Sequence, residues 1–194
     1  MQLVLASSSA RRRELMELAG YEFTVYVSDA DETTDVADPA VLVRELALKK
    51  ALAVKQELNA PCCIVGADTV VVIDDTIIGK PKDEADAFRI LKTLNNRTHT
   101  VYTGLCVACG ADEPEVFCDA TRVTFMDLSD EEIWRYIKTG DPMDKAGAYG
   151  VQGAGCVLVK RVDGCYFTVI GLPMPVLYKA LREKGIMPMK AKAR

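Results

Sequence analysis

The stretch GADTVVVIDDTIIGKP, residues 66–81, sets one aspartate inside an apolar run and a Lys-Pro pair just beyond that run. Apolar and β-branched residues over 62–73 predict a buried strand, and the Asp-Asp pair that follows predicts a turn. A charged side chain is costly to bury unless a cation, a hydrogen-bond donor or a cleft faces it. We therefore interpret Asp68 as a functional carboxylate.

Strand and helix patterns continue on both sides of this stretch. Apolar runs and alternation predict strands at residues 2–6, 21–28, 62–73, 98–110 and 115–127. Helical spacing predicts helices within 7–20, from 38 to about 58, within 83–96, after a capping box at Ser129 and from about 175 to 184. A further hairpin is predicted where 156–162 and 165–170 flank an Asp-Gly pair. The pattern predicts an α/β fold with a mixed β-sheet flanked by helices.

Length and composition limit the class of protein. The chain of 194 residues matches one large α/β domain, so we predict a single domain over 1–194 with a frayed basic tail at about 185–194. A formal net charge of −4 and no Lys/Arg-rich block in the body of the chain argue against nucleic acid as a partner. Apolar runs stop well short of a membrane span. We therefore expect no membrane partner and a cytoplasmic location.

The chain has seven cysteines, an odd number with no small secreted framework around them. We expect reduced thiols. Cys106 and Cys109 form a C-x-x-C pattern inside a predicted strand, where residues three apart point to opposite faces. This placement favours packing cysteines over a zinc site. The single histidine, His99, also lies in a predicted strand, and we interpret it as structural.

A serine-rich turn, SSSARRR at 7–13, joins the first strand to the first helix. Free backbone N–H groups and the positive end of a helix dipole gather at such a turn, so anions bind there. Arg11 and Arg12 fall in the first helical turn, which is unfavourable for cations unless an anion compensates. The alternative is a solvated basic helix face with ordinary serine capping.

Further charged residues extend this pattern. Lys50 and Lys80 are candidate cations for an anion, although a lone lysine is usually a surface residue. Glu32 lies in an acidic loop, and such a loop taken alone is expected to be solvated. Carboxylates near a cluster of cations are typical of a metal-bound polyphosphate, because Mg²⁺ is held by one or two carboxylates together with substrate phosphates.

These motifs, in this order, resemble the Maf family of nucleoside triphosphate pyrophosphatases from about residue 3 to residue 184. The matching stretches are LASSSARRREL, GADTVV, GKP, THTVYTG and DKAGAYGVQG. The resemblance implies an elongated α/β fold shared with the inosine triphosphate pyrophosphatases. It also implies a divalent metal cofactor, Mg²⁺, Mn²⁺ or Co²⁺, and hydrolysis of a nucleoside triphosphate to the monophosphate and pyrophosphate.

The resemblance also assigns roles to residues. Asp68 corresponds to the catalytic proton acceptor, and with Glu32 it forms the acidic partner of metal or water. The implied triphosphate contacts are Ser7, Ser9, Arg12, Lys50 and Lys80.

Within the family, the group acting on dTTP and UTP is similar to this chain at Arg11, Thr69 and Gln152, which implies that these residues set substrate specificity. Two positions depart from the family pattern: Ala10 replaces a proline, and Lys49 stands where a glutamate is frequent.

The sequence alone leaves other functions open. A nucleotide-binding regulator of cell division or septum formation, with weak catalysis, would use the same motifs. An RNA-binding protein is disfavoured, because the chain lacks a basic stripe and an aromatic stacking platform. A homodimer is compatible with the sequence, which does not determine the oligomeric state.

Overall fold

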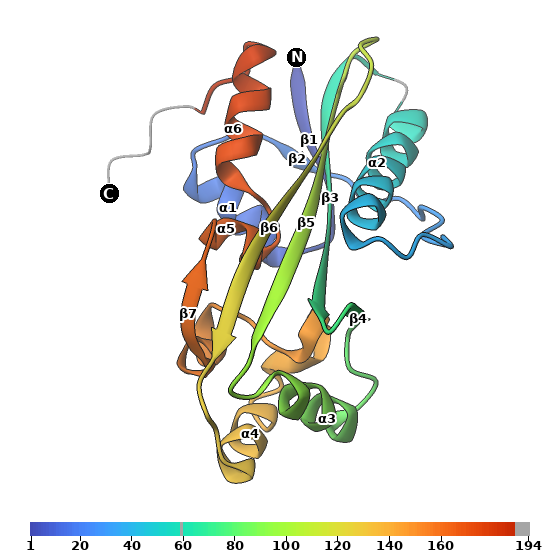
Figure 1. The fold of residues 1–194 in the computed structure, drawn as a ribbon. Helices are drawn as coiled ribbons and strands as arrows, with labels where there is room; N and C mark the ends of the chain where they lie inside the picture. Colours follow the sequence, from blue (N-terminus) through green and yellow to red (C-terminus); the bar gives the residue numbers. More distant parts are fainter. Residues whose placement is uncertain (59, 189–194) are drawn as a thin grey trace. The chain divides into compact units, whose positions relative to one another are not determined.

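The computed structural model describes residues 1–58 and 60–188, which form two compact units. The first unit contains Met1–Asp68, Thr103–Asp119 and the residues from 171 onward, and the second contains Thr69–Tyr102 and Ala120–Ile170. The strands are ordered β2-β1-β3-β5-β6-β7, with β4 paired to β3 (Figure 1). The predicted mixed sheet with flanking helices is confirmed. The single domain over residues 1–194 stays a prediction.

The first three strands of the chain pair in parallel in the first unit. The elements of this unit are β1 (Gln2–Ala6), α1 (Ala10–Leu18), β2 (Thr24–Val25), α2 (Pro39–Leu58), part of β3 (Cys62–Ile73), parts of β5 (Thr98–Cys109) and β6 (Glu115–Phe125), and α6 (Met174–Glu183). Strand β1 pairs in parallel with β2 and with β3, where Ala6 lies beside Gly66. The predicted strand at 21–28 is reduced to the two residues of β2.

Helix α2 lies directly on the sheet of the first unit. A methyl group on Gly66 of β3 would overlap the carbonyl oxygen of Ala47, and one on Gly104 of β5 would overlap that of Val43. Glycine at these two positions therefore lets the helix backbone approach the strands. Apolar residues of α2, β1 and β3 complete a buried cluster around this contact. This close approach of α2 to the sheet sets the positions of the polar side chains of the helix.

The second unit packs helices on antiparallel strand pairs. Besides the remaining parts of β3, β5 and β6, its elements are β4 (Thr76–Ile78), α3 (Glu84–Leu94), α4 (Asp130–Ile137), η1 (Asp141–Asp144), η2 (Ala146–Ala148), η3 (Gly153–Leu158), β7 (Val159–Asp163) and α5 (Tyr166–Ile170). Strand β4 pairs with β3, and β7 pairs with β6. The predicted capping box is confirmed, because the Ser129 and Glu132 side chains each accept from the other residue's backbone N–H.

The predicted hairpin at 156–162 and 165–170 is wrong. Residues 159–163 form β7, which pairs with β6, and 166–170 form the short helix α5. Gly164, at φ +133°, leads the chain against β6, where a methyl group on it would lie 2.6 Å from the Thr121 hydroxyl. Thr121 in turn donates to the Cys165 carbonyl at 3.0 Å. Tertiary contacts thus override the strand preference of the β-branched and aromatic residues in this segment.

The cysteines also differ from expectation. Cys63 and Cys109 are joined by a disulfide, so the prediction of reduced thiols is wrong for this pair. Residues so far apart in sequence meet because they lie on β3 and β5. Cys106 has a free thiol buried in the core of the first unit, as predicted for a packing cysteine.

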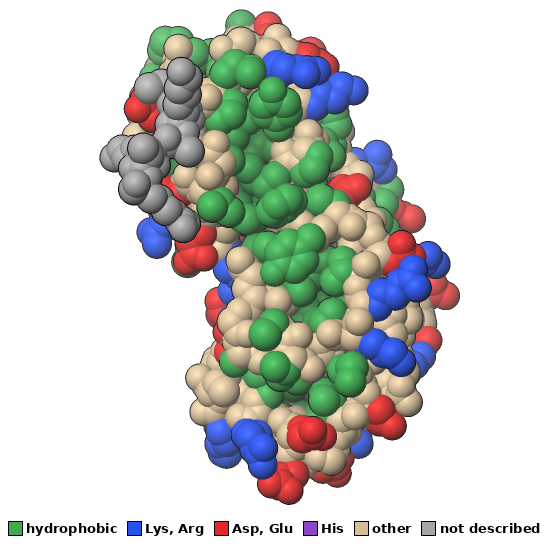
Figure 2. Space-filling view, turned by 90° about the vertical axis from the view of Figure 1, so that its left-hand side faces the viewer, with side chains coloured by type: hydrophobic (Ala, Val, Ile, Leu, Met, Phe, Trp, Pro, Cys, Tyr) green, Lys and Arg blue, Asp and Glu red, His purple; other side chains and the backbone are tan. Residues whose placement is uncertain are grey.

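The chain end and the surface complete the description. Gly185 and Ile186 still donate to carbonyls of α6, while residues 189–194 of the predicted tail lie outside the described residues. On the face shown in Figure 2, basic and acidic side chains are interspersed around hydrophobic ones. Within 1–58 and 60–188, no helix combines the length and apolar character that a membrane crossing requires.

Candidate active site

The turn between β1 and α1 is held by its own serines. Ser9 caps α1 by accepting from the Arg12 backbone N–H at 3.4 Å, and Ser7 accepts from the Ser9 backbone N–H at 3.2 Å. Ser7 is buried and Ser9 is half-buried. A hydroxyl that accepts one hydrogen bond can still donate its own hydrogen, so both serines retain donors for an anion.

Arg12 ties three segments of the first unit together. Its Nε donates to the Gly171 carbonyl at 2.8 Å, and its Nη1 donates to the Ala67 carbonyl at 2.9 Å and to the Ser7 hydroxyl at 3.1 Å. Burial lowers the pKa of the guanidinium, and the negative charge of Asp68 acts in the opposite direction. Arg12 is thus a structural cross-link beside Asp68, a role that sequence reasoning missed because two of the three acceptors are backbone carbonyls.

Lys50 of α2 joins the two predicted acids. Its Nζ lies 2.6 Å from Asp68 Oδ1 and 3.2 Å from Glu32 Oε2. The Asp68 side chain is 13% exposed and Lys50 is 18% exposed, while Glu32 is 56% exposed. The cation that offsets the cost of burying Asp68 is therefore Lys50, as close approach of α2 to β3 allows.

The acidic loop that carries Glu32 is anchored to α2 by a second lysine. Lys49 Nζ donates to the Thr33 carbonyl at 2.7 Å and pairs with Glu45 at 2.8 Å. Two neighbouring lysines on α2 therefore hold this loop against the helix. Lys49 stands where a glutamate is frequent in the family pattern. Its ammonium supplies a hydrogen-bond donor to the loop, which a glutamate carboxylate would not supply.

The other predicted residues belong to the second unit. Thr69 follows Asp68 on β3 and is half-buried, Lys80 is exposed, and Gln152 is half-buried as the N-cap residue of η3. The backbone N–H of Gly147 donates to the Gly79 carbonyl at 3.0 Å. The Gly-Lys-Pro motif and the glycine-rich segment 145–153 are therefore bonded to one another, although they lie far apart in sequence.

His99 lies on β5 in the core of the second unit. It is 2% exposed, its Nε2 lies 2.7 Å from the Tyr149 hydroxyl, and its ring packs edge-on against Phe125. Burial lowers its pKa to about 4. The histidine is thus neutral near pH 7, and its ring is part of the packed core of the second unit.

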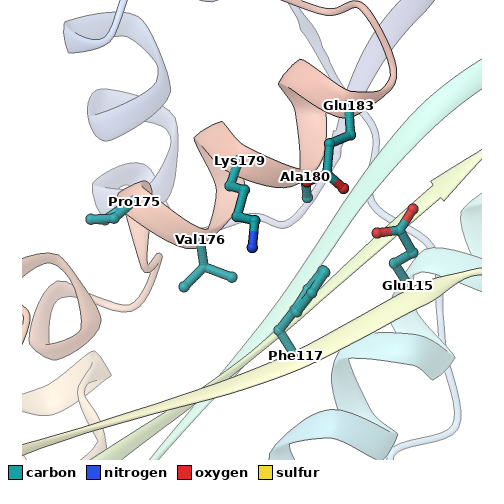
Figure 3. Close-up of a pocket in the computed structure, with 7 residues that line it drawn as sticks. All are labelled: Glu115, Phe117, Pro175, Val176, Lys179, Ala180 and Glu183. Atoms are coloured by element: carbon teal, nitrogen blue, oxygen red, sulfur yellow. The ribbon is translucent and has the colours of Figure 1, made fainter.

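A shallow groove in the first unit is separate from these residues. Its volume is about 360 Å³, and it lies between α6 and β6, where Val176 and Lys179 project toward Phe117 (Figure 3). Its lining residues include none of the predicted site residues.

The acids present suit a hard divalent cation. Asp68 and Glu32 both approach one ammonium group, so their oxygens converge on a single cationic position. Among the described residues, no group of three or more His, Cys, Asp or Glu side chains is gathered for a metal. Two carboxylates fit Mg²⁺ or Mn²⁺ only when substrate phosphates supply further ligands.

Comparisons with known proteins agree with these features. The sequence model of one family, described as Maf-like protein, matches residues 2–184. The dTTP/UTP pyrophosphatase of Aquifex aeolicus is 47% identical over 190 residues, covering 96% of this chain and 97% of that protein. The proteins of the same name from Clostridium beijerinckii and Thermococcus kodakarensis are 45% and 46% identical, covering 94% of this chain and 99% and 96% of those proteins.

A solved structure supports the fold. The Staphylococcus aureus Ham1 protein matches with a TM-score of 0.52 at 16% identity, covering 80% of this chain and 78% of that one. At this identity the likeness concerns the fold alone.

Proposed function

Since this chain belongs to the Maf-like protein family, we propose that it is a nucleoside triphosphate pyrophosphatase that hydrolyses dTTP and UTP to the monophosphate and pyrophosphate. Relatives bearing that activity in their names match it at 43–47% identity over nearly the whole chain. The observation that carries the proposal is the contact of Lys50 with both Asp68 and Glu32, which gathers two carboxylates and a cation.

Asp68 is the residue we assign to proton transfer. It is the less exposed of the two acids, and its Oδ1 is held at 2.6 Å by Lys50, which orients the carboxylate. An oriented carboxylate can accept a proton from a water molecule that attacks the α-phosphorus, while the bond to the β-phosphate breaks and pyrophosphate leaves. The ammonium of Lys50 also opposes the negative charge of this carboxylate.

Phosphate binding is assigned to two serines and two lysines. Ser7 and Ser9 would donate hydroxyl hydrogens, and Lys50 and Lys80 would oppose phosphate charge. Arg12 contributes positive charge at the turn, while its Nε and Nη1 donate to protein acceptors. Its contribution is therefore mainly an electrostatic one from a fixed position.

Base selection is assigned to Arg11, Thr69 and Gln152. The amide of Gln152 offers a donor and an acceptor, which match the edge of uracil or thymine. A base with a different donor pattern would leave these groups unpaired, and that costs affinity.

The proposed cofactor is Mg²⁺, Mn²⁺ or Co²⁺, held by Glu32 and Asp68. When bound, such an ion neutralises charge that develops on the phosphates. We also propose that the protein acts in the cytoplasm, where its nucleotide substrates are found, and that it needs neither nucleic acid nor membrane. Its assembly as a homodimer stays a prediction.

The test is a pyrophosphate-release assay with all common nucleoside triphosphates, with and without divalent metal. We expect metal-dependent release from dTTP and UTP, and a loss of roughly 10²–10⁴-fold in kcat for Asp68→Asn. Asp74→Asn is the matched control, because that aspartate lies just beyond the same strand and is 66% exposed. Full activity after exhaustive chelation would remove the metal from the proposal.

The alternative function is nucleotide binding without turnover in the regulation of cell division. It predicts that dTTP binds with no pyrophosphate released above the Asp68→Asn background. That result would favour the regulator over the enzyme.

A further inference from the structure

A buried tyrosine hydroxyl lies inside the segment that carries Gln152. Tyr136 of α4 is 5% exposed, and its hydroxyl accepts from the Gly150 backbone N–H at 3.2 Å. The same hydroxyl donates to Asp141 Oδ2 at 2.6 Å. Both the donor and the acceptor capacity of this oxygen are therefore used within the segment that follows α4.

The segment closes around this hydroxyl on both sides of Gln152. A methyl group on Gly155 would overlap the Gly150 carbonyl oxygen and would lie 2.9 Å from the Tyr136 hydroxyl. Gly150 and Gly155, which bracket Gln152, thus meet one another and the tyrosine. The backbone from 150 to 155 forms a loop with the hydroxyl at its closure.

A lysine secures the same loop from the other side. Lys145 Nζ donates to the Asp141 carbonyl at 2.5 Å and to Asp144 Oδ1 at 2.7 Å, and its side chain is 11% exposed. Its stem lies over Gly150, where a methyl group would stand 2.9 Å from Cε. Asp141 therefore receives hydrogen bonds from both Tyr136 and Lys145, and the three side chains form one network under the loop.

We infer that Tyr136 is a positioning residue for substrate selection: its hydroxyl, held by Asp141, fixes the loop 150–155 and thereby sets where Gln152 presents its amide. The inference rests on the proposed role of Gln152 in base recognition. An amide discriminates between bases only if its donor and acceptor are held in one orientation, because a mobile amide can adapt to either pattern. Tyr136 itself need not touch the substrate.

The first test compares Tyr136→Phe with Tyr149→Phe in the absence of nucleotide. Tyr149 is an equally buried tyrosine at 5% exposure, and its hydroxyl bonds His99 instead of the loop backbone. Amide hydrogen exchange is measured over residues 146–158. We expect exchange to rise roughly two- to tenfold at Gly150 in Tyr136→Phe only, as for the loss of one neutral hydrogen bond. Unchanged exchange in Tyr136→Phe would overturn the inference.

The second test measures kcat/KM for dTTP, UTP and GTP in a double-mutant cycle. Tyr136→Phe should lower the dTTP/GTP ratio roughly two- to tenfold, and it should have no further effect on that ratio when Gln152 is already alanine. Equal losses in Tyr149→Phe, or additive losses in the double variant, would assign the effect to stability alone and refute positioning.

The two tests separate this inference from the function it rests on. A parent protein that releases no pyrophosphate, or that shows no base preference, would sink the proposed function. The exchange result at Gly150 would still decide whether Tyr136 holds the loop.

Discussion

The single histidine makes the stability of the second unit depend on pH in a window of its own. His99 is 2% exposed, and burial lowers its pKa from 6.5 to about 4. Protonation would require an acceptor for each ring N–H, yet Nδ1 has no hydrogen-bond partner among the described residues. The folded protein therefore resists the protonation that the unfolded chain undergoes near pH 6.5.

The sign and size of the effect follow from the two pKa values. Between them the unfolded state binds more protons, so stability falls as pH falls. The contribution of His99 is fully present above pH 6.5 and is lost as pH drops toward 4. A difference of this size corresponds to about 3 kcal/mol in total, of which about 2 kcal/mol is lost between pH 7 and pH 5.

The assay is urea unfolding of the parent and of His99→Gln at several pH values from 7 to 5, at constant ionic strength. The range stops at pH 5 because carboxylates titrate below it. We expect the parent to lose about 2 kcal/mol over this range and the variant to lose almost none, whatever its absolute stability. A parent whose stability is flat, or a variant with the same slope as the parent, would refute the reasoning.

Three further predictions follow from the packing and the site. Gly66→Ala should lower stability by about 1–3 kcal/mol in urea unfolding, because the added methyl overlaps the backbone of α2, whereas Gly79→Ala, which meets nothing within 4 Å, should be neutral. Ser129→Ala should cost about 1 kcal/mol of stability without changing pyrophosphate release, since it removes a capping box and no site residue; a change in activity would contradict this. Arg12→Ala should lower both the urea midpoint and kcat/KM, because Arg12 donates to three internal acceptors. Lys80 is exposed, so Lys80→Ala should lower kcat/KM roughly a hundredfold and leave the urea midpoint unchanged. Equal stability of these last two variants would show that the Arg12 cross-link carries no stability.

Local chemistry made several elements predictable. The strand 2–6, the long helix from Pro39 and the capping box at Ser129 occur as predicted. The apolar residues of the strand and the helix, the proline that begins the helix and the Ser-Glu pair of the cap are all local signals. Neighbours in sequence therefore suffice to choose the conformation. The segment 165–170 was predicted wrongly for the opposite reason: its β-branched and aromatic residues favour a strand, but Gly164 leads the chain against Thr121 of β6, which donates to the Cys165 carbonyl.

The candidate site shows the same division. The apolar run around Asp68 is enough to predict that this acid needs a partner, because an acid in an apolar run is costly to bury alone. The sequence also predicts an anion site at the serine-rich turn. These statements depend on residue type and on short-range spacing, which the sequence contains.

The contacts between these groups depend on how the helices pack on the strands. This packing selected Lys50 as the partner of Asp68, because glycines on β3 and β5 let α2 approach the sheet. It turned Arg12 into an internal cross-link and brought the Tyr136 hydroxyl under the loop of Gln152. The physical reason is that each of these contacts joins residues from separate elements, often through a backbone carbonyl or N–H that every residue possesses. Such groups leave no mark in a sequence, and their partners are chosen by the packing of helices on strands.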